Sequence, residues 1–171
     1  MTDDDGGGEA GRDIDGLGDA PVGTLARDRA ALAPVRDSLA AADFYAYGHV
    51  DEQNRWTVAA DAEEGRVDVR VGGDGFEVVL WTSSPGLYAD EEDPFRRRAL
   101  ERLARIQIPT IERGFLEPHQ RAHWDETELG VAVTIRFELP FTRAADVGAF
   151  VRSRFDELDR LLAFVEARVT A

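Results

Sequence analysis

Two histidines are the side chains in this sequence whose types and spacing could do chemistry together. His119 and His123 lie four positions apart, and carboxylates flank them at Glu117, Asp125 and Glu126. On one helix, a His-x-x-x-His spacing directs both imidazoles at a single metal ion, beside which a carboxylate can act as a base. A metal-dependent hydrolase is therefore one hypothesis. On a strand, the same two side chains share a face but lie about 13 Å apart, which is too far for one metal.

The residues around this pair favour a solvated loop. Pro118 disfavours a helix at this point, because proline lacks an amide donor and clashes with the preceding turn. The base would also have to be Glu126, which lies outside the two histidines. We therefore predict no catalytic residue and no cofactor, and we retain His119 and His123 only as candidate metal ligands.

The elements that would position this pair follow from hydrophobic periodicity. Residues 129–139 alternate apolar and wetter side chains, which is typical of an antiparallel strand with one face on a core. Residues 120–124 are expected to form a brief strand that pairs with it. After Pro140, apolar residues recur at steps of three and four, which predicts one stripe of a long amphipathic helix. That stripe comprises Val147, Val151, Phe155, Leu158, Leu162, Val165 and Val169.

The same C-terminal helix has a second apolar face. Phe150, Leu161 and Phe164 flank the main stripe, so the helix is apolar over a wide arc and needs cover on more than one side. Either the sheet and another helix cover this face within the monomer, or a second copy covers it. We predict an interaction surface for a protein partner or a homodimer at these three residues.

Three further runs of alternating residues predict consecutive hairpins in the first half of the chain, since tight glycine-containing turns separate them. These runs are residues 56–60, 67–71 and 76–81. Aromatic residues precede them at Phe44, Tyr45 and Tyr47, and we expect these to pack in the core. The segment up to Val50 is expected to be an extended linker or a short strand.

Two further helices are predicted, and a proline limits each of them. The alanine-rich segment 24–42 is expected to break near Pro34, with residues 34–42 as its better-formed piece. Asp93 before Pro94 is a typical helix start, because an N-cap residue is followed by proline at the first helical position. Pro109 is expected to end that helix.

Together these elements predict an α+β fold. The expected arrangement is an antiparallel sheet of about five strands with helices packed on one side, in the order α-β-β-β-α-β-β-α. Residues 1–21 are rich in aspartate and glycine and have almost no apolar side chains, so we expect a disordered acidic tail. Residues 22–171 are expected to form a single domain.

Charge is the most unusual feature of the composition. The 171 residues include 34 acidic and 20 basic side chains, all of the latter arginine, which gives a net charge of −14 at pH 7. The acidic excess is spread along the chain, so it indicates either adaptation of the whole protein to concentrated salt or a surface for a basic partner. We favour adaptation to salt, because a partner surface should be local. A chain of this charge disfavours nucleic-acid binding.

The cellular location of the protein is predicted from three sequence features that are absent: a membrane helix, a signal peptide and cysteine. No apolar run approaches the roughly 20 residues that a membrane helix needs, and the N-terminus does not have the layout of a signal peptide. The sequence has no cysteine, so no disulfide holds the domain together. We expect a soluble cytoplasmic protein that binds no membrane.

The order of the predicted elements and a few short motifs resemble the YbjN family, which shares the fold of type III secretion chaperones. The motifs are Trp56-Thr57-Val58, the strand ending Leu80-Trp81-Thr82-Ser83-Ser84-Pro85, the helix start Asp93-Pro94, and the strand Val133–Leu139 with Pro140-Phe141-Thr142 leading into the last helix. The likeness covers roughly residues 25–169, and the stretch 106–125 is longer than the family's usual short link.

This resemblance implies a chaperone-like α+β domain that is often dimeric and is discussed as a regulatory or protein-interaction module. It carries no active-site residues over to this sequence. The leading hypothesis is therefore a noncatalytic protein-binding or regulatory module adapted to high salt. The alternative is a metal-dependent hydrolase that uses His119 and His123.

Overall fold

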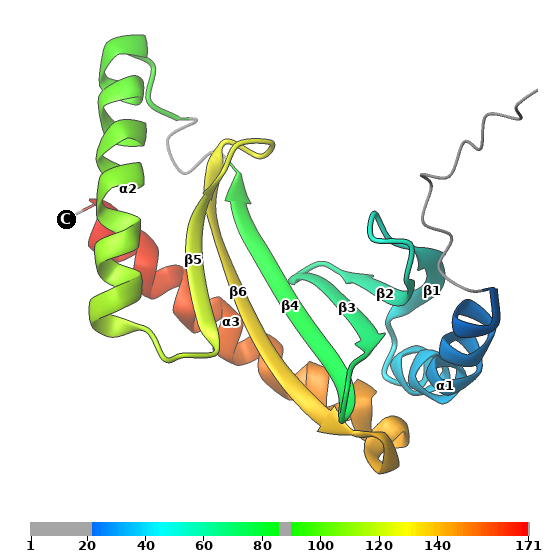
Figure 1. The fold of residues 1–171 in the computed structure, drawn as a ribbon. Helices are drawn as coiled ribbons and strands as arrows, with labels where there is room; N and C mark the ends of the chain where they lie inside the picture. The colour runs from blue at the N-terminus through cyan, green and yellow to red at the C-terminus, as the bar shows by residue number, and fades with distance from the viewer. Residues whose placement is uncertain (1–21, 86–89, 171) are drawn as a thin grey trace, which may run out of the picture.

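An antiparallel sheet of six strands forms the centre of the structure, a computed structural model that describes residues 22–85 and 90–170 (Figure 1). The strands are β1 (Tyr45–Val50), β2 (Trp56–Ala62), β3 (Gly65–Val71), β4 (Gly75–Pro85), β5 (Gln120–Asp125) and β6 (Gly130–Pro140). Their order across the sheet is β1-β2-β3-β4-β6-β5, and every neighbouring pair is antiparallel. The two edges are therefore β1 and β5. The predicted disordered tail at 1–21 lies outside the described residues.

Three α-helices and one 3-10 helix complete the fold. These are α1 (Val22–Ala41), α2 (Pro94–Phe115), the 3-10 helix η1 (Phe141–Asp146) and α3 (Val147–Thr170). Helix α1 packs on β1, β2 and β3, helix α3 packs on β4 and β6, and α2 packs on β5 and α3. The α+β class, the antiparallel sheet and the helices on one side are confirmed.

The core lies between the sheet and the helices. Alternate residues of the central strands point into it, which is why the period-two pattern of 129–139 predicts β6 correctly. From the sheet, Leu80 and Ile135 are fully buried, and they share the core with Phe155 and Leu158 of α3. Each such side chain contributes about 1.5–3 kcal/mol by leaving water. We call the helix-packed side of the sheet the covered face. Among the described residues, no helix covers the opposite side, which we call the open face (Figure 1).

Both proline predictions are wrong. Helix α1 continues through Pro34, and α2 continues through Pro109 as far as Phe115. Each proline removes one helical hydrogen bond at a cost of about 3 kcal/mol. Buried apolar side chains on both sides of each proline offset this cost, and they include Val35 in α1 and Ile108 in α2.

Strand β1 is the element that raises the strand count from about five to six. Of the two interpretations left open for this segment, the short strand is the one that forms, and it pairs with β2 from Tyr45 to Val50. The expectation of core packing holds for Phe44, which is 5% exposed, but fails for Tyr45, which is 75% exposed. Tyr45 lies on an edge strand and on the sheet face that no described helix covers, so no other element buries it.

Candidate functional site

The helical His-x-x-x-His arrangement does not form. Helix α2 ends at Phe115, and His119 lies in the turn just before β5 begins at Gln120. His119 Nε2 lies 3.3 Å from Glu157 Oε1 of α3, and Gln120 Nε2 donates to the same oxygen at 3.0 Å. Partial burial raises the pKa of Glu157, but the hydrogen bonds from Arg154, Gln120 and His119 outweigh it, so the pKa is lowered. His119 therefore lies in a hydrogen-bonding network that joins the start of β5 to α3.

His123 points the other way. It is a β5 residue paired with Ala132 of β6, next to Ala122, which is 3% exposed on the core side. Because side chains alternate along a strand, His123 lies on the open face of the sheet, whereas His119 reaches a helix on the covered face. Among the described residues, no group of three or more His, Asp or Glu side chains is placed to hold a metal ion. The geometry that the hydrolase hypothesis requires is not formed.

The predicted interaction surface on α3 is largely occupied within the chain. Leu161 is 7% exposed. The ring of Phe150 lies 5.0 Å from Phe137 of β6, and the ring of Phe164 lies 6.1 Å from Phe115 of α2, measured between centroids. The sheet and a second helix thus cover this face, which is the first of the two arrangements that the sequence left open. Leu161 is not accessible to a partner, and Phe150 and Phe164 are half-buried.

Helix α2 carries apolar side chains on two opposite faces. Its inner face packs on the body through Ala104, Ile108 and Ile111, all of which are buried. Its outer face carries an exposed row that we call the outer stripe, made of Phe95, Ala99, Leu103 and Ile106. Three of these are large: Phe95 is 80%, Leu103 48% and Ile106 65% exposed.

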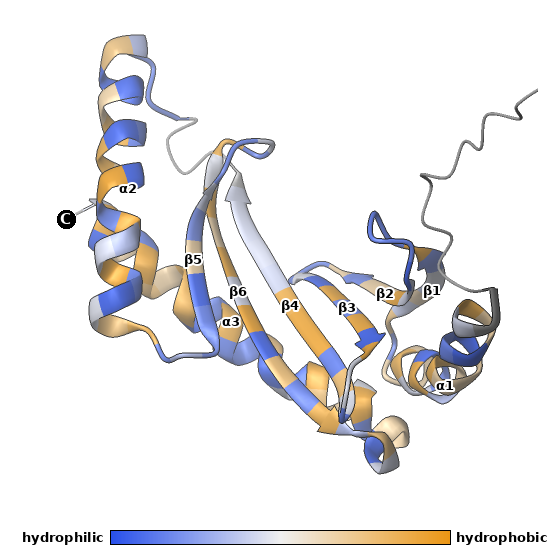
Figure 2. Cartoon of the chain, in the orientation of Figure 1, coloured by the Kyte–Doolittle hydropathy of each residue, from blue (hydrophilic) through white to orange (hydrophobic). Residues whose placement is uncertain are grey.

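The outer stripe lies on a well-defined and projecting helix. Asp93 caps α2, with its Oδ1 accepting the Phe95 N–H at 2.9 Å, as the sequence predicts. The first turns of α2 extend past the end of the sheet (Figure 1), and the helix packs on the core from Leu100 and Ala104 onward. Hydrophobic residues recur along its whole length, including the projecting part (Figure 2). The spacing of the stripe at steps of four, four and three places its members on one side of the helix.

Helix α2 is also basic, unlike the chain as a whole. It contains six arginines and two glutamates, a balance of +4 in a chain whose net charge is −14. Arg98, Arg102 and Arg113 are exposed beside or along the outer stripe. Near the base of the helix, Arg105 lies 3.0 Å from Glu126 and its guanidinium stacks 5.2 Å from the Trp124 ring centroid. The sequence interpretation missed this surface, although two apolar stripes on one helix were a readable signal.

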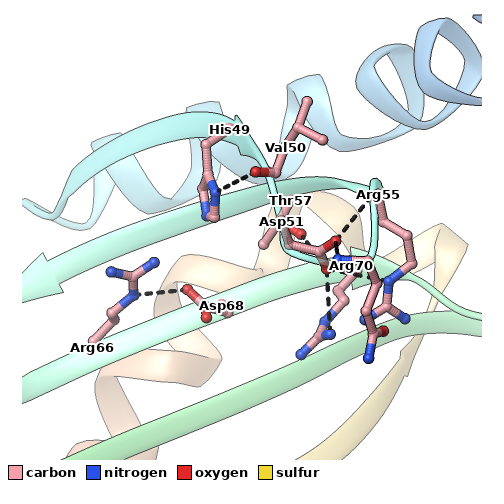
Figure 3. Close-up of polar contacts among 9 residues, drawn as sticks. His49, Val50, Asp51, Arg55, Thr57, Arg66, Asp68 and Arg70 are labelled. Carbon is pink, nitrogen blue, oxygen red and sulfur yellow. Dashed lines mark hydrogen bonds and ion pairs between the residues drawn. The ribbon is translucent and has the colours of Figure 1, made fainter. Parts of the chain in front are cut away.

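A second exposed region lies at the opposite edge, in the β1–β2 hairpin (Figure 3). Asp51 closes the hairpin: its Oδ1 accepts the N–H groups of Gln53 and Arg55 at 2.9 Å each. Its Oδ2 lies 3.2 Å from Arg55 Nε and 3.6 Å from Arg70 Nη1. Partial burial raises the pKa of Asp51, but these backbone donors and the Arg55 guanidinium together lower it below its ordinary value.

Three aromatic side chains form a row along β1 on the open face. The ring centroids of Tyr45 and Tyr47 lie 5.8 Å apart, and those of Tyr47 and His49 lie 6.0 Å apart. The Tyr47 hydroxyl donates to Asp61 Oδ2 at 3.1 Å. Partial burial raises the pKa of Tyr47, and the bond to Asp61 adds to this against the opposing charge of Arg66. The hydrogen bond to Asp61 therefore holds the Tyr47 side chain in place, whereas the Tyr45 side chain is exposed to solvent.

The exposed apolar residues are concentrated at the two ends of the sheet. Of the eight large hydrophobic residues that are exposed in the described part of the chain, six lie on α2 or β1. No helix among the described residues is long and apolar enough to cross a bilayer. No family model, no curated protein and no solved structure matches the chain. Function is therefore inferred from these two surfaces.

Proposed function

We propose that this chain is a noncatalytic, cytoplasmic protein-binding module, adapted to high salt, whose outer stripe on α2 binds an acidic amphipathic helix of a partner protein. The observation that carries the proposal is the second apolar face of α2, with Leu103 48% and Ile106 65% exposed. The resemblance to the YbjN family and its chaperone-like fold is part of the proposal and rests on the element order and motifs given above.

Apolar burial supplies the affinity in this proposal. Full burial of an exposed large apolar side chain is worth about 1.5–3 kcal/mol, and a partner that covers Phe95, Leu103 and Ile106 gains the share of this that corresponds to their exposed 80%, 48% and 65%. A helix laid along this stripe would contact it through its own residues at i, i+4 and i+7. The first turns of α2 extend past the end of the sheet, where no other labelled element lies beside them (Figure 1).

Charge selects the partner. The arginines at positions 98, 102 and 113 flank or continue the outer stripe, so a docked helix with glutamates or aspartates at its margins gains complementary contacts. A second copy of α2 would bring the same arginine-rich margins together, and like charges at an interface oppose association. We therefore favour an acidic partner over self-association through this helix.

Adaptation to high salt and the cytoplasmic location have separate support. The acidic excess persists outside the first twenty residues, where the remaining chain has a balance of −8. Such a surface repels itself at low ionic strength, and salt screens the repulsion. The absence of cysteine from the sequence means that the domain gains nothing from an oxidising compartment.

The test uses two synthetic helical peptides that share leucines at i, i+4, i+8 and i+11 and differ in their flanking residues, glutamate in one and lysine in the other. Fluorescence anisotropy at about 0.15 M salt measures binding of each peptide to the full chain, since charges act over about 8 Å there. The glutamate peptide is expected to bind at least about tenfold more tightly than the lysine peptide. The double variant Leu103→Ser/Ile106→Ser is expected to lose at least about tenfold in affinity for it.

Leu129→Asn is the matched control, because Leu129 is an exposed apolar residue, 54% accessible, that lies outside α2. It should leave binding of the peptide unchanged. Equal binding of both peptides, or binding that the double variant does not weaken, contradicts the proposal. Binding of the chain to anionic vesicles in place of the peptide would assign the stripe to a membrane surface and would also overturn it.

A further inference from the structure

The outer side of strand β1 presents backbone groups that no described element pairs with. β1 is the first strand of the sheet and has β2 as its sole neighbour in the described structure. The Asp51 N–H donates across the hairpin to the Arg55 carbonyl at 2.9 Å. Because donors alternate in direction along an antiparallel strand, the N–H and C=O groups of Ala46, Gly48 and Val50 point away from β2.

This edge lacks the features that normally prevent strands from pairing. Tyr45–Val50 has the sequence YAYGHV, with no Asp, Glu, Lys, Arg or Pro, in a chain that is 32% charged. Its pairing with β2 is continuous, with no bulge. Tyr45 is 75% and Val50 46% exposed. An exposed edge strand without charge, proline or a bulge is a template for another strand.

We propose that β1 pairs antiparallel with β1 of a second copy across a twofold axis, so that the two sheets become one. The outward-pointing residues of the two strands must face each other, which restricts the register. The register that pairs all three outward-pointing residues of each strand places Gly48 on the axis and Ala46 opposite the partner's Val50. On the open face, Tyr47 then lies opposite the partner's His49, and Tyr45 lies opposite the partner's Asp51.

The absence of charged side chains from β1 favours a second copy of the chain as the occupant. A copy of this chain has a net charge of −14, so two copies approach each other best where neither presents an acidic side chain. β1 is uncharged, and the proposed register places no like charges directly opposite each other. A twofold interface needs a patch that is complementary to itself, and an uncharged antiparallel strand fulfils this condition. The surface is independent of the outer stripe on α2, which lies at the other end of the sheet (Figure 1).

The first experiment measures the mass of the full chain in molar salt by sedimentation equilibrium, for the wild type and for Val50→Lys. A lysine on the edge strand is expected to raise the dimer dissociation constant at least about tenfold. Leu129→Lys is the matched control, since it adds the same charge at another exposed apolar position, and it should leave the dimer unchanged. A monomeric wild type, or a dimer insensitive to Val50→Lys, overturns the proposal.

The second experiment tests the register and uses the fact that the sequence has no cysteine. Tyr47→Cys and His49→Cys are prepared separately and then mixed under mild oxidation. The Cα atoms of directly opposed residues in a non-hydrogen-bonded pair lie about 4.5 Å apart. This is within the range of about 4.4–6.8 Å between the Cα atoms of two disulfide-bonded cysteines. The mixture is expected to form a covalent dimer that neither variant forms alone. Cross-linking of either variant with itself would show another register and contradict the one proposed.

The two proposals fail separately. If the Leu103→Ser/Ile106→Ser variant loses the dimer while Val50→Lys keeps it, the chain self-associates through α2. That result would overturn both the partner-helix proposal for α2 and the strand-pairing proposal for β1. Peptide binding that persists in Val50→Lys, together with a dimer that persists in the α2 variant, is the result that supports both.

Discussion

The two edge strands of the sheet differ in how the rest of the fold treats them. At β5, helix α2 packs against the strand, and Glu112 Oε2 accepts the Ala122 N–H at 3.1 Å. At β1, no described strand or helix pairs with the outer backbone groups, although the Val50 carbonyl lies 3.4 Å from Nδ1 of the neighbouring His49 (Figure 3). The sheet is thus closed at one edge and extensible at the other. Edge strands are normally protected, so the unprotected one is the better indication of a contact with another chain.

The side chains also make β5 the protected edge and β1 the unprotected one. β5 has Arg121 and Asp125 on the open face of the sheet, whereas β1 has the aromatic row that begins at Tyr45. The helix that closes β5 also offers a second apolar face to solvent. One end of the molecule is therefore suited to pair strands, and the other to bind a helix.

The largest expected effect comes from loosening the closed edge. Ile108→Ala removes a side chain that is 2% exposed on the inner face of α2, so it should lower the free energy of unfolding by about 2–5 kcal/mol. Ile106→Ala removes the same atoms from the outer stripe, where the side chain is 65% exposed, and should change it by less than about 0.5 kcal/mol. Urea denaturation measures both. Similar losses would contradict the assignment of two faces to α2.

The next effect concerns the loop that holds the open edge. Asp51→Ala removes the acceptor of two backbone N–H groups and the ion-pair partner of Arg55 and Arg70, and we expect a loss of about 1–3 kcal/mol. Asp125 is the counterpart in the β5–β6 hairpin, where its Oδ1 accepts the Thr127 and Glu128 N–H groups at 2.8 and 3.1 Å. Asp125→Ala should cost less, about 1 kcal/mol. Thermal denaturation of both variants checks the order, and a reversed order contradicts it.

A smaller effect is expected from acid. The folded-state pKa values of Asp51 and Glu157 are lowered below their ordinary values of 3.8 and 4.5. Both groups therefore stabilise the fold at neutral pH, and this contribution is lost as the pH falls below the ordinary values through the lowered ones. Asp51→Asn should be less stable than the wild type at pH 7, and the difference should shrink towards pH 3. A difference that grows on acidification would contradict the direction of the shift.

Salt should produce the smallest and most general change. Raising KCl from about 0.1 M to about 1 M shortens the screening length from about 10 Å to about 3 Å, which weakens repulsion among the exposed acids. The melting temperature of the wild type should rise, as should that of Val50→Lys, because the acidic excess is not confined to either edge. A constant or falling melting temperature would remove adaptation to salt from the proposed function.

Local patterns explain which parts of the fold the sequence predicts. The alternation in 129–139 and the Asp93-Pro94 start are local signals, and both elements form as predicted. The continuity of α1 and α2 through Pro34 and Pro109 depends on what packs beside each proline, which no local pattern contains. The expected pairing of residues 120–124 with β6 also forms, and the turn after Asp125 joins the two strands; the solvated-loop prediction is therefore wrong for His123, which lies in β5.

The candidate surfaces were harder to predict, for one physical reason. Leu103 and Ile108 are both apolar residues on the same helix, and only the position of β5 and α3 determines which of them is exposed. Leu161 is buried for the same reason, although the sequence placed it on an interaction surface. His119 contacts Glu157, 38 residues further along the chain, so its role in joining β5 to α3 is a tertiary fact.

The most direct test of the contrast between the two edges is amide hydrogen exchange at Gly48 and Ala122, followed by NMR at several protein concentrations. The Ala122 amide donates to Glu112 within the monomer, so it should be protected at every concentration. The Gly48 amide should exchange freely in dilute protein and become protected as copies pair. Protection of Gly48 that does not depend on concentration, or free exchange at Ala122, would contradict the account of one closed and one open edge.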